Sequence, residues 1–419
     1  MPKNLALFLD GTWNDAKDQT NVWWLHQALA PLDARGREQR GQYDKGVGTQ
    51  WSDRLIGGLL GYGLSKNALE AYEWLADNYE ENDDIYLFGF SRGAYTARSV
   101  AGLIKTCGLL RKNASATSDA MWDRYQSLKS TDPRHAAARP IHTIVFAHEQ
   151  GKPLTPDEEL LLRDSRRVWI KMIGVWDTVG ALGIPDSNLP WIGRERHVFH
   201  NTYPSTIVDH SFHALAIDEL RHPYAPTLWT KFSPYTPDPA PVGASEREKS
   251  GRPPAEIEQR WFSGSHSDVG GGYPKPRLSH IPLHWMKDKA QGCGLAFKSL
   301  PVLRGDEHRG EDGLAYEKFG LGLWKRVHPP FHRAIGAAPR EVSGKNGTST
   351  AINEHIDASV FLRFKETTGY EPSGVTDWAA RQHLRVADLS GEQVVARPTV
   401  STRVDTPQQP SARRVSSRG

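Results

Sequence analysis

The segment Gly89-Phe90-Ser91-Arg92-Gly93 constrains the fold of this chain more than any other. It follows the apolar run Ile85–Phe88 and precedes the helix-forming stretch Ala94–Ile104. A Gly-x-Ser-x-Gly pattern between a strand and a helix predicts a nucleophile elbow, a tight turn that exposes the serine hydroxyl at the end of the strand. Because the two glycines lack a Cβ, strand and helix can approach closely around Ser91. The flanking patterns disfavour the alternative, a plain glycine-rich loop.

Apolar runs alternate with amphipathic stretches along most of the chain. The expected strands are Leu5–Leu9, Gln42–Asp44, Ile85–Phe88, Val168–Trp176 and Ile257–Phe262. The expected helices are Val22–Leu29 (with Asn21 as N-cap), Lys66–Tyr79, Ala94–Ile104, Ser118–Leu128, Pro156–Arg163, Asp209–Leu220 and His280–Ala290. This alternation predicts an α/β fold with a mainly parallel central sheet and helices on both faces.

Residues 1–397 are expected to form one such domain. Residues 184–204 lack clear periodicity and are expected to be an insertion that caps or lines the cleft. Residues 237–254 are expected to be a second insertion, a polar and proline-rich surface loop. Residues 398–419 are rich in Ser, Thr, Pro, Gln and Arg, and are expected to be a disordered basic tail.

The composition, with 38% hydrophobic and 24% charged residues, is typical of a soluble protein with a sizeable core. The tail alone accounts for the net charge of +3, so the folded body is near neutral and lacks the basic footprint of a nucleic-acid-binding protein. The apolar run within Met1–Asp10 is too short for a signal peptide. No stretch has the length of a membrane-spanning helix. We therefore expect a protein that is cytoplasmic as synthesised, with a signal-independent route as its means of export.

Three residues have the types and the chain order of a hydrolytic triad. A serine hydroxyl needs a histidine to take its proton and a carboxylate to orient that histidine. Ser91, Asp177 and His266 occur in the order nucleophile, acid, base, and each follows a predicted strand. Other residues remain open for these roles, or as structural neighbours of the site: the acids Asp209, Asp218 and Asp268, and the histidine His213 in the predicted helix.

An oxyanion hole for this nucleophile needs two backbone N–H donors. The N–H of Arg92, directly after the serine, is the first candidate. The second is Gly11 or Thr12, since their turn follows a strand expected beside the elbow strand. Asp10 would repel an oxyanion, so we expect it to pair with Arg92 or to cap its own turn.

No cofactor or metal is predicted. Gly270-Gly271-Gly272 lacks the Lys and Ser/Thr of a phosphate-binding P-loop, and we interpret it as a turn that positions His266. Histidine and cysteine do not recur at zinc-ligand spacing, and the two cysteines, Cys107 and Cys293, make no disulfide framework.

Several motifs in fixed order resemble the α/β-hydrolase domain of type VI secretion phospholipase effectors, a domain long known only as one of unknown function. The resemblance runs from residue 5 to about 365. The matching segments are Leu7–Asn14, Gly46–Thr49, Gly89–Ala94, Val175–Gly180, His213–Glu219, Trp261–Tyr273 and Ile281–Met286.

The resemblance implies a cofactor-independent serine hydrolase acting on ester bonds, in the best-known members those of glycerophospholipids. It supports Ser91, Asp177 and His266 as the triad and implies transient contact with a lipid surface. Two other interpretations stay open: a hydrolase-like fold that serves as a binding or regulatory module, and membrane association through the arginines of the tail. No oligomeric state follows from the sequence.

Overall fold

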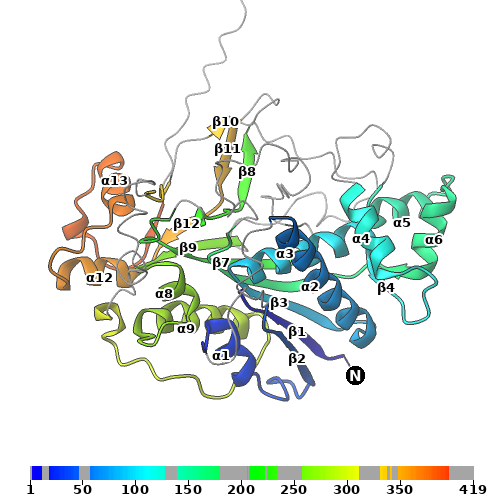
Figure 1. Cartoon of the computed structure of the whole chain (residues 1–419), viewed down its shortest axis with the longest axis horizontal. Coiled ribbons are helices and arrows are strands. Elements are labelled where there is room, and N and C mark those ends of the chain that lie inside the picture. The colour runs from blue at the N-terminus through cyan, green and yellow to red at the C-terminus, as the bar shows by residue number, and fades with distance from the viewer. Residues whose placement is uncertain are drawn as a thin grey trace, which may run out of the picture.

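A central eight-stranded sheet organises the fold, in the order β13-β12-β9-β7-β6-β3-β1-β2 (Figure 1). Neighbouring strands are parallel except for the edge pair β12 and β13, which confirms the predicted α/β class. The strands are β1 (Asn4–Leu9), β2 (Gln39–Asp44), β3 (Asp84–Phe90), β6 (Ile170–Trp176), β7 (Val208–Ala216), β9 (Ile257–Phe262), β12 (Glu354–Ile356) and β13 (Gln393–Val394).

The computed structural model describes residues 2–11, 18–46, 57–127, 139–179, 205, 207–221, 224–233, 257–310, 331–336, 340–341 and 348–395, with only the backbone taken for 57–64, 231–233, 340–341 and 348–350. Thr12, the expected insertions 184–204 and 237–254, and the expected tail 398–419 lie outside the described residues.

Helices cover both faces of the sheet (Figure 1). Successive side chains on a strand point to opposite faces, so an apolar strand needs a helix layer on each face. On β1, Leu5, Leu7 and Leu9 pack with α2 (Gly57–Asn78) and α3 (Arg92–Cys107). Ala6 and Phe8 face the opposite side, with α1 (Asn21–Ala28) and α9 (Arg277–Gly292). All five side chains are at most 2% exposed. Both faces of the strand are therefore buried, which explains its unbroken apolar run.

The remaining elements extend this frame. Helices α4 (Ser118–Ser127) and α5 (Ile141–Glu149) lie beside α3, and α6 (Pro156–Asp164) lies beside α5. The strand pair β4 (Leu109–Leu110) and β5 (Ser165–Arg166) contacts α2 and α6. A small sheet contains β10 (Arg340–Glu341), β11 (Thr348–Ala351) and β8 (Thr230–Ser233). At the β12 end are α12 (Ala358–Glu366), α13 (Ser373–Arg381) and the short helices η5 (Glu307–Arg309) and η6 (Val386–Asp388).

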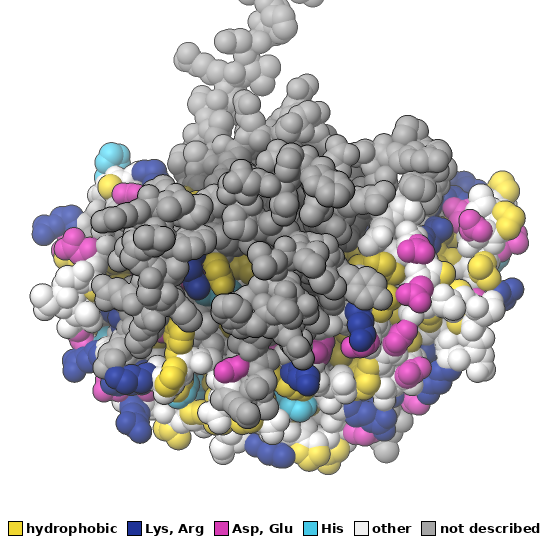
Figure 2. All heavy atoms as spheres, in the orientation of Figure 1, with side chains coloured by type: hydrophobic (Ala, Val, Ile, Leu, Met, Phe, Trp, Pro, Cys, Tyr) yellow, Lys and Arg dark blue, Asp and Glu magenta, His cyan; other side chains and the backbone are white. Residues whose placement is uncertain are grey.

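Charged side chains of both signs are interspersed on the face drawn in Figure 2, as expected for a near-neutral body. Among the described helices, none is both long and apolar enough to cross a bilayer.

Several predicted elements need correction. Asp209–Leu220 was expected to be a helix, but Val208–Ala216 is strand β7. Both faces of this strand are buried, and the polar Ser211 and His213 lie on one of them. The sequence therefore does not show the alternation of apolar and polar residues that marks a half-exposed strand. The short helix α8 (His266–Gly270), which has a capping box, was not predicted. Gly271 and Gly272 follow it with positive φ, in the segment where a glycine-rich turn was expected.

Helix boundaries also differ from the prediction. Helix α2 begins at Gly57, within glycines that had suggested a loop. Helix α1 takes Thr20 as its N-cap, and its side chain accepts from the N–H of Trp23. Tertiary packing outweighs local propensity at such positions.

The elbow glycines allow β3 and α3 to approach closely, as the sequence predicted, and they also allow α3 to lie against the end of β1. A Cβ on Gly93 would overlap the carbonyl oxygens of Leu9 and Asp10, and a Cβ on Gly89 would meet the carbonyl of Gly93. The start of α3 therefore rests directly on the ends of β1 and β3.

This contact predicts a large cost for a single added carbon. We expect Gly93→Ala to lower the free energy of unfolding by about 2 kcal/mol or more, because the obstructing atoms are backbone. Gly292→Ala is the matched control, since a Cβ at this helical position meets no atom within 4 Å. It should leave stability unchanged or raise it by up to about 1 kcal/mol. Urea unfolding of both variants provides the measurement, and equal midpoints would contradict the packing argument.

Candidate active site

Ser91 occupies a strained turn between β3 and α3. Its backbone has φ 57° and ψ −119°, a region that costs a non-glycine residue about 1–3 kcal/mol. The Ser91 N–H donates to the carbonyl of Trp176 at 3.0 Å, which ties the turn to the end of β6. The Ser91 side chain does not cap α3. The hydroxyl is thus not used for helix capping, as a nucleophile elbow requires.

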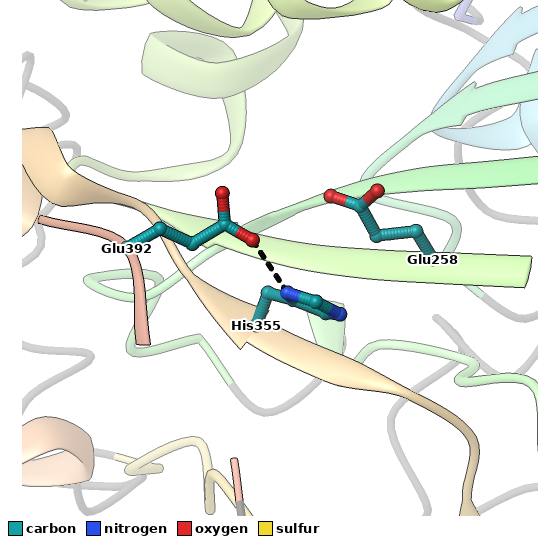
Figure 3. Close-up of side chains that lie close together, drawn as sticks. All are labelled: Glu258, His355 and Glu392. Carbon is teal, nitrogen blue, oxygen red and sulfur yellow. Dashed lines mark hydrogen bonds and ion pairs between the residues drawn. The ribbon is translucent and has the colours of Figure 1, made fainter. Parts of the chain in front are cut away.

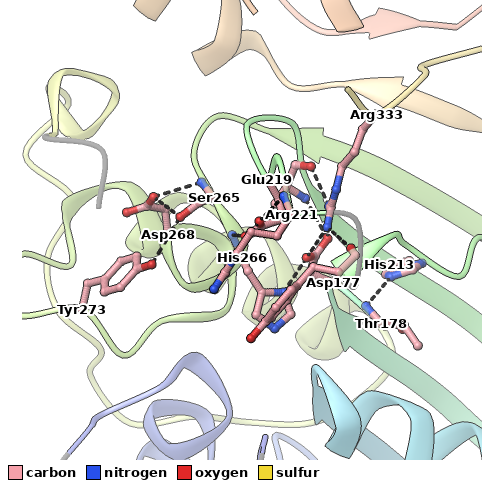
Figure 4. Close-up of polar contacts among 12 residues, drawn as sticks. Asp177, Thr178, His213, Glu219, Arg221, Ser265, His266, Asp268, Tyr273 and Arg333 are labelled. Atoms are coloured by element: carbon pink, nitrogen blue, oxygen red, sulfur yellow. Dashed lines mark hydrogen bonds and ion pairs between the residues drawn. The ribbon is translucent and has the colours of Figure 1, made fainter. Parts of the chain in front are cut away.

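Asp177 and His266 are joined directly (Figure 4). Nδ1 of His266 lies 2.5 Å from Oδ2 of Asp177, and both side chains are at most 6% exposed. Asp177 follows β6, while His266 opens α8 after β9, so the pair spans three adjacent strands of the sheet. Nδ1 is engaged by Asp177 in this bond, so Nε2 is the ring nitrogen that Asp177 does not engage.

Aromatic rings hold the imidazole on two sides. The ring of Phe90, the residue before Ser91, lies 4.6 Å from that of His266 between centroids. Tyr224 meets the imidazole edge-on at 4.9 Å. The contact with Phe90 places the imidazole beside the elbow, although the Ser91 hydroxyl hydrogen-bonds neither His266 nor Asp177 in this structure.

Asp177 is fully buried, and each of its carboxylate oxygens has two partners. Oδ1 accepts from the N–H of Ala216 at 3.1 Å and from Arg333 at 2.5 Å. Oδ2 accepts from Arg333 at 2.9 Å and bonds His266. Burial alone would raise the pKa of Asp177, but the charge of Arg333 and the bond to His266 hold it below its usual range. The carboxylate is therefore ionised and fixed in one orientation.

The other acids that the sequence left open have different partners. Asp268 accepts from the N–H and the hydroxyl of Ser265, and Ser265 is the N-cap residue of α8. Asp218 accepts from the N–H of Gly264 and the hydroxyl of Tyr370. Asp209 forms an ion pair with Lys171. Among these acids and Asp177, only Asp177 has a described hydrogen bond to the imidazole of His266.

The turn after β1 lies beside the elbow, since β1 pairs with β3 as expected. The carboxylate of Asp10 accepts from the N–H of Gly11 at 2.7 Å and from the hydroxyls of Thr20 and Tyr43. Asp10 therefore caps its own turn, one of the two expected roles. The Gly11 N–H is occupied by this bond, and Thr12 lies outside the described residues.

Two residues of this site were not predicted. Glu219 accepts from the backbone N–H of His266 at 3.2 Å and is paired with Arg221 (Figure 4). It stands in the motif His213–Glu219, which offered a signal. Arg333 binds Asp177 from far along the chain, and no local pattern marks it.

One group among the described residues has the spacing of a metal site: ligand atoms of Glu258, His355 and Glu392 lie within 4.8 Å of one another (Figure 3). Arg260 pairs with Glu258 at 2.6 Å and with Glu392 at 2.7 Å, and Lys289 also pairs with Glu258. A metal ion would have to displace the guanidinium. The cluster instead acts as an ion-pair network at the β9–β12 edge.

His213 lies on β7, fully buried, and its Nε2 accepts from the N–H of Thr178 at 3.1 Å. Burial, together with the charge of Arg98, lowers the pKa of His213 to about 3. In the unfolded chain this imidazole takes up a proton below about pH 6.5, whereas in the folded protein it stays neutral until the pH approaches 3. Its contribution to stability is complete above that pH and is lost progressively as the pH falls toward 3.

We expect His213→Gln to flatten the pH dependence of stability, because glutamine keeps an acceptor for Thr178 but takes up no proton. Between pH 6 and 4.5 the slope of unfolding free energy should fall by about 1.4 kcal/mol per pH unit. Urea midpoints across this range measure the slope, with the exposed His383→Gln as control. Identical slopes for wild type and His213→Gln would show that the buried imidazole does not carry the effect.

One sequence relative, two solved structures and one family model are similar to this chain. An uncharacterized protein of Saccharomyces cerevisiae is 29% identical over 253 residues, which cover 56% of this chain and 34% of that protein. An uncharacterized protein from Pseudomonas aeruginosa has a TM-score of 0.36 at 18% identity, covering 73% of this chain and 47% of that one. The Tle1 effector bound to the VgrG spike of the type VI secretion system has a TM-score of 0.35 at 17% identity, with coverage of 66% and 52%.

The chain thus spans about a third of the yeast relative and about half of each solved chain. The model for the catalytic domain of Tle1-like phospholipase effectors of type VI secretion matches residues 3–289, more than half of the chain. This match includes the elbow and the Asp177–His266 pair. The chain belongs to the family of Tle1-like phospholipase effector catalytic domains.

Proposed function

We propose that this protein is a serine hydrolase that cleaves carboxylic ester bonds through an acyl-enzyme formed on Ser91. The observation that carries the proposal is the hydrogen bond between His266 Nδ1 and Asp177 Oδ2, beside a strained serine turn. A carboxylate at Nδ1 sets the tautomer that leaves Nε2 as the base, and it stabilises the imidazolium that forms.

In the proposed cycle, Nε2 of His266 takes the hydroxyl proton as Ser91 attacks the ester carbonyl. The imidazolium then protonates the leaving alcohol, and an acyl-enzyme remains. Water then enters and attacks the acyl carbon while His266 takes its proton. The imidazolium returns this proton to the Ser91 oxygen as the bond to the acyl group breaks and the acid leaves. Because the hydroxyl and the imidazole are not hydrogen-bonded in the free protein, this contact would tighten when substrate binds.

The oxyanion of each tetrahedral intermediate needs backbone donors near Ser91. The N–H of Arg92 suits this role, since the first N–H groups of a helix have no intrahelical acceptor and the helix dipole favours negative charge there. The Gly11 N–H would first have to leave Asp10. Thr12 is therefore our preferred second donor.

A phospholipid is the substrate class that we favour, on the strength of the family. The Arg92 side chain adds support, because burial lowers the pKa of its guanidinium and no described carboxylate forms an ion pair with it. An anionic phosphodiester would supply a counter-charge for this guanidinium. Effector membership also supports delivery by a type VI secretion system as an accompanying proposal.

Removal of the nucleophile tests the mechanism. We expect Ser91→Ala to lose labelling by a fluorophosphonate probe and to lower turnover of a short-chain nitrophenyl ester by at least about 10³-fold. Ser99→Ala, a buried serine on the same helix, should keep both activities. Folded wild type that neither labels nor turns over esters would favour the binding-module interpretation instead.

Charge neutralisation at Arg92 tests the substrate class. We expect Arg92→Gln to lower kcat/KM on a glycerophospholipid by about tenfold or more while leaving a neutral nitrophenyl ester within about threefold, since only the former carries the phosphate. The two substrates are compared on the same preparation. An equal loss on both would place the side chain of Arg92 in a structural role.

A further inference from the structure

Arg333 lies in the described segment 331–336, beyond residue 289, where the family match ends. Its side chain is completely buried, and its guanidinium is directed at the acid of the proposed triad (Figure 4). One nitrogen donates to Asp177 Oδ1 and to the carbonyl of Ala216, and the other donates to Asp177 Oδ2 and to the carbonyl of Tyr224. This two-pronged geometry holds both carboxylate oxygens at once.

The rest of the segment is held by the fold on either side of Arg333. The N–H of Phe331 donates to the carbonyl of Leu220, just beyond β7. Arg381 on α13 donates to the carbonyl of Ile335, and the Ile335 side chain is packed in the core cluster of α12 and α13. Gly374 lies so close to the Arg333 carbonyl that a Cβ there would crowd it, at 2.5 Å. The C-terminal helices thus deliver this side chain to the sheet.

Other charged groups face the Asp177–His266 pair and do not replace Arg333. Glu219, which contacts the backbone of His266, is matched by Arg221, and Arg221 lies over the ring of Tyr224. His213 is neutral near pH 7, and Arg98 stands behind it against Trp229. Among the described residues, Arg333 is the cation with an ion pair to Asp177.

We propose that Arg333 is a positioning residue, supplied by the C-terminal region, that locks the Asp177 carboxylate against His266 and keeps this pair from taking up a further proton near neutral pH. The inference rests on the proposed function for its catalytic consequence. A fixed positive charge disfavours any added proton on the pair, wherever that proton resides. The pair therefore remains in its proton-accepting form to lower pH than it would without this charge.

A purely structural role predicts a loss of stability and nothing more, so the test is the pH dependence of reactivity. The rate of fluorophosphonate labelling is measured between pH 5 and 9 for wild type and Arg333→Met, with thermal unfolding measured alongside. We expect the acid limb of the Arg333→Met profile to move to higher pH by about one unit. An unchanged midpoint and rate in folded Arg333→Met would overturn the proposal.

Arg363→Met is the matched control. Arg363 is another buried arginine of the C-terminal region, and it donates to the carbonyls of His308 and Gly310 rather than to the triad acid. Its loss should lower the unfolding temperature without moving the acid limb. An equal shift in Arg363→Met would assign the effect to general loosening and overturn the proposal.

Arg333→Lys covers the case in which methionine prevents folding. Lysine keeps the charge but not the two-pronged geometry, so the acid limb should stay near that of wild type while the plateau rate falls about tenfold or more. A wild-type plateau in this variant would contradict the positioning role.

Failure of the proposed function can be told apart from failure of this inference. If wild type is not labelled by the fluorophosphonate, the proposed mechanism fails. The low-field proton NMR resonance of the Nδ1–H of His266 still reports the protonation of the Asp177–His266 pair directly. Its midpoint with pH should rise in Arg333→Met whether or not Ser91 reacts, and a resonance that titrates as in wild type would overturn the proposal.

Discussion

A carboxylate removed from water at the carboxyl end of β6 is the constraint on which this site depends. Burial of Asp177 would be costly without partners, because a buried charge must be paired and hydrogen-bonded. The partners come from β7 through the Ala216 N–H, from α8 through His266 and from the C-terminal region through Arg333. Segments far apart along the chain therefore meet at one carboxylate, and the chemistry that we propose follows from their meeting.

The parallel sheet makes that meeting possible. Strands β3, β6, β7 and β9 are successive neighbours, so residues that follow them emerge at the same edge. The elbow adds a local requirement, since α3 can begin directly against β1 only where Gly93 has no side chain. Ser91 at the elbow and Asp177 are both non-glycine residues with positive φ, a strained conformation that is common where a fold holds functional groups in place.

Much of this architecture was predictable because its signals are local. Buried parallel strands read as unbroken apolar runs, and a serine between glycines after such a run has few other structural uses. The prediction failed where burial hides periodicity, as on β7, whose polar residues lie inside. It also failed for α8, since five residues are too few for a helical period and its capping box is the main local cue.

By itself, the sequence determined the α/β class, the elbow at Ser91 and the order in which Asp177 and His266 follow it, because each rests on residue types at short spacing. Only the tertiary structure decided which acid bonds the imidazole, that Asp10 occupies the Gly11 N–H, and that Arg333 lies against Asp177. These are contacts across the sheet edge between distant segments. Strand order and burial determine these contacts, and no short sequence pattern predicts strand order or burial.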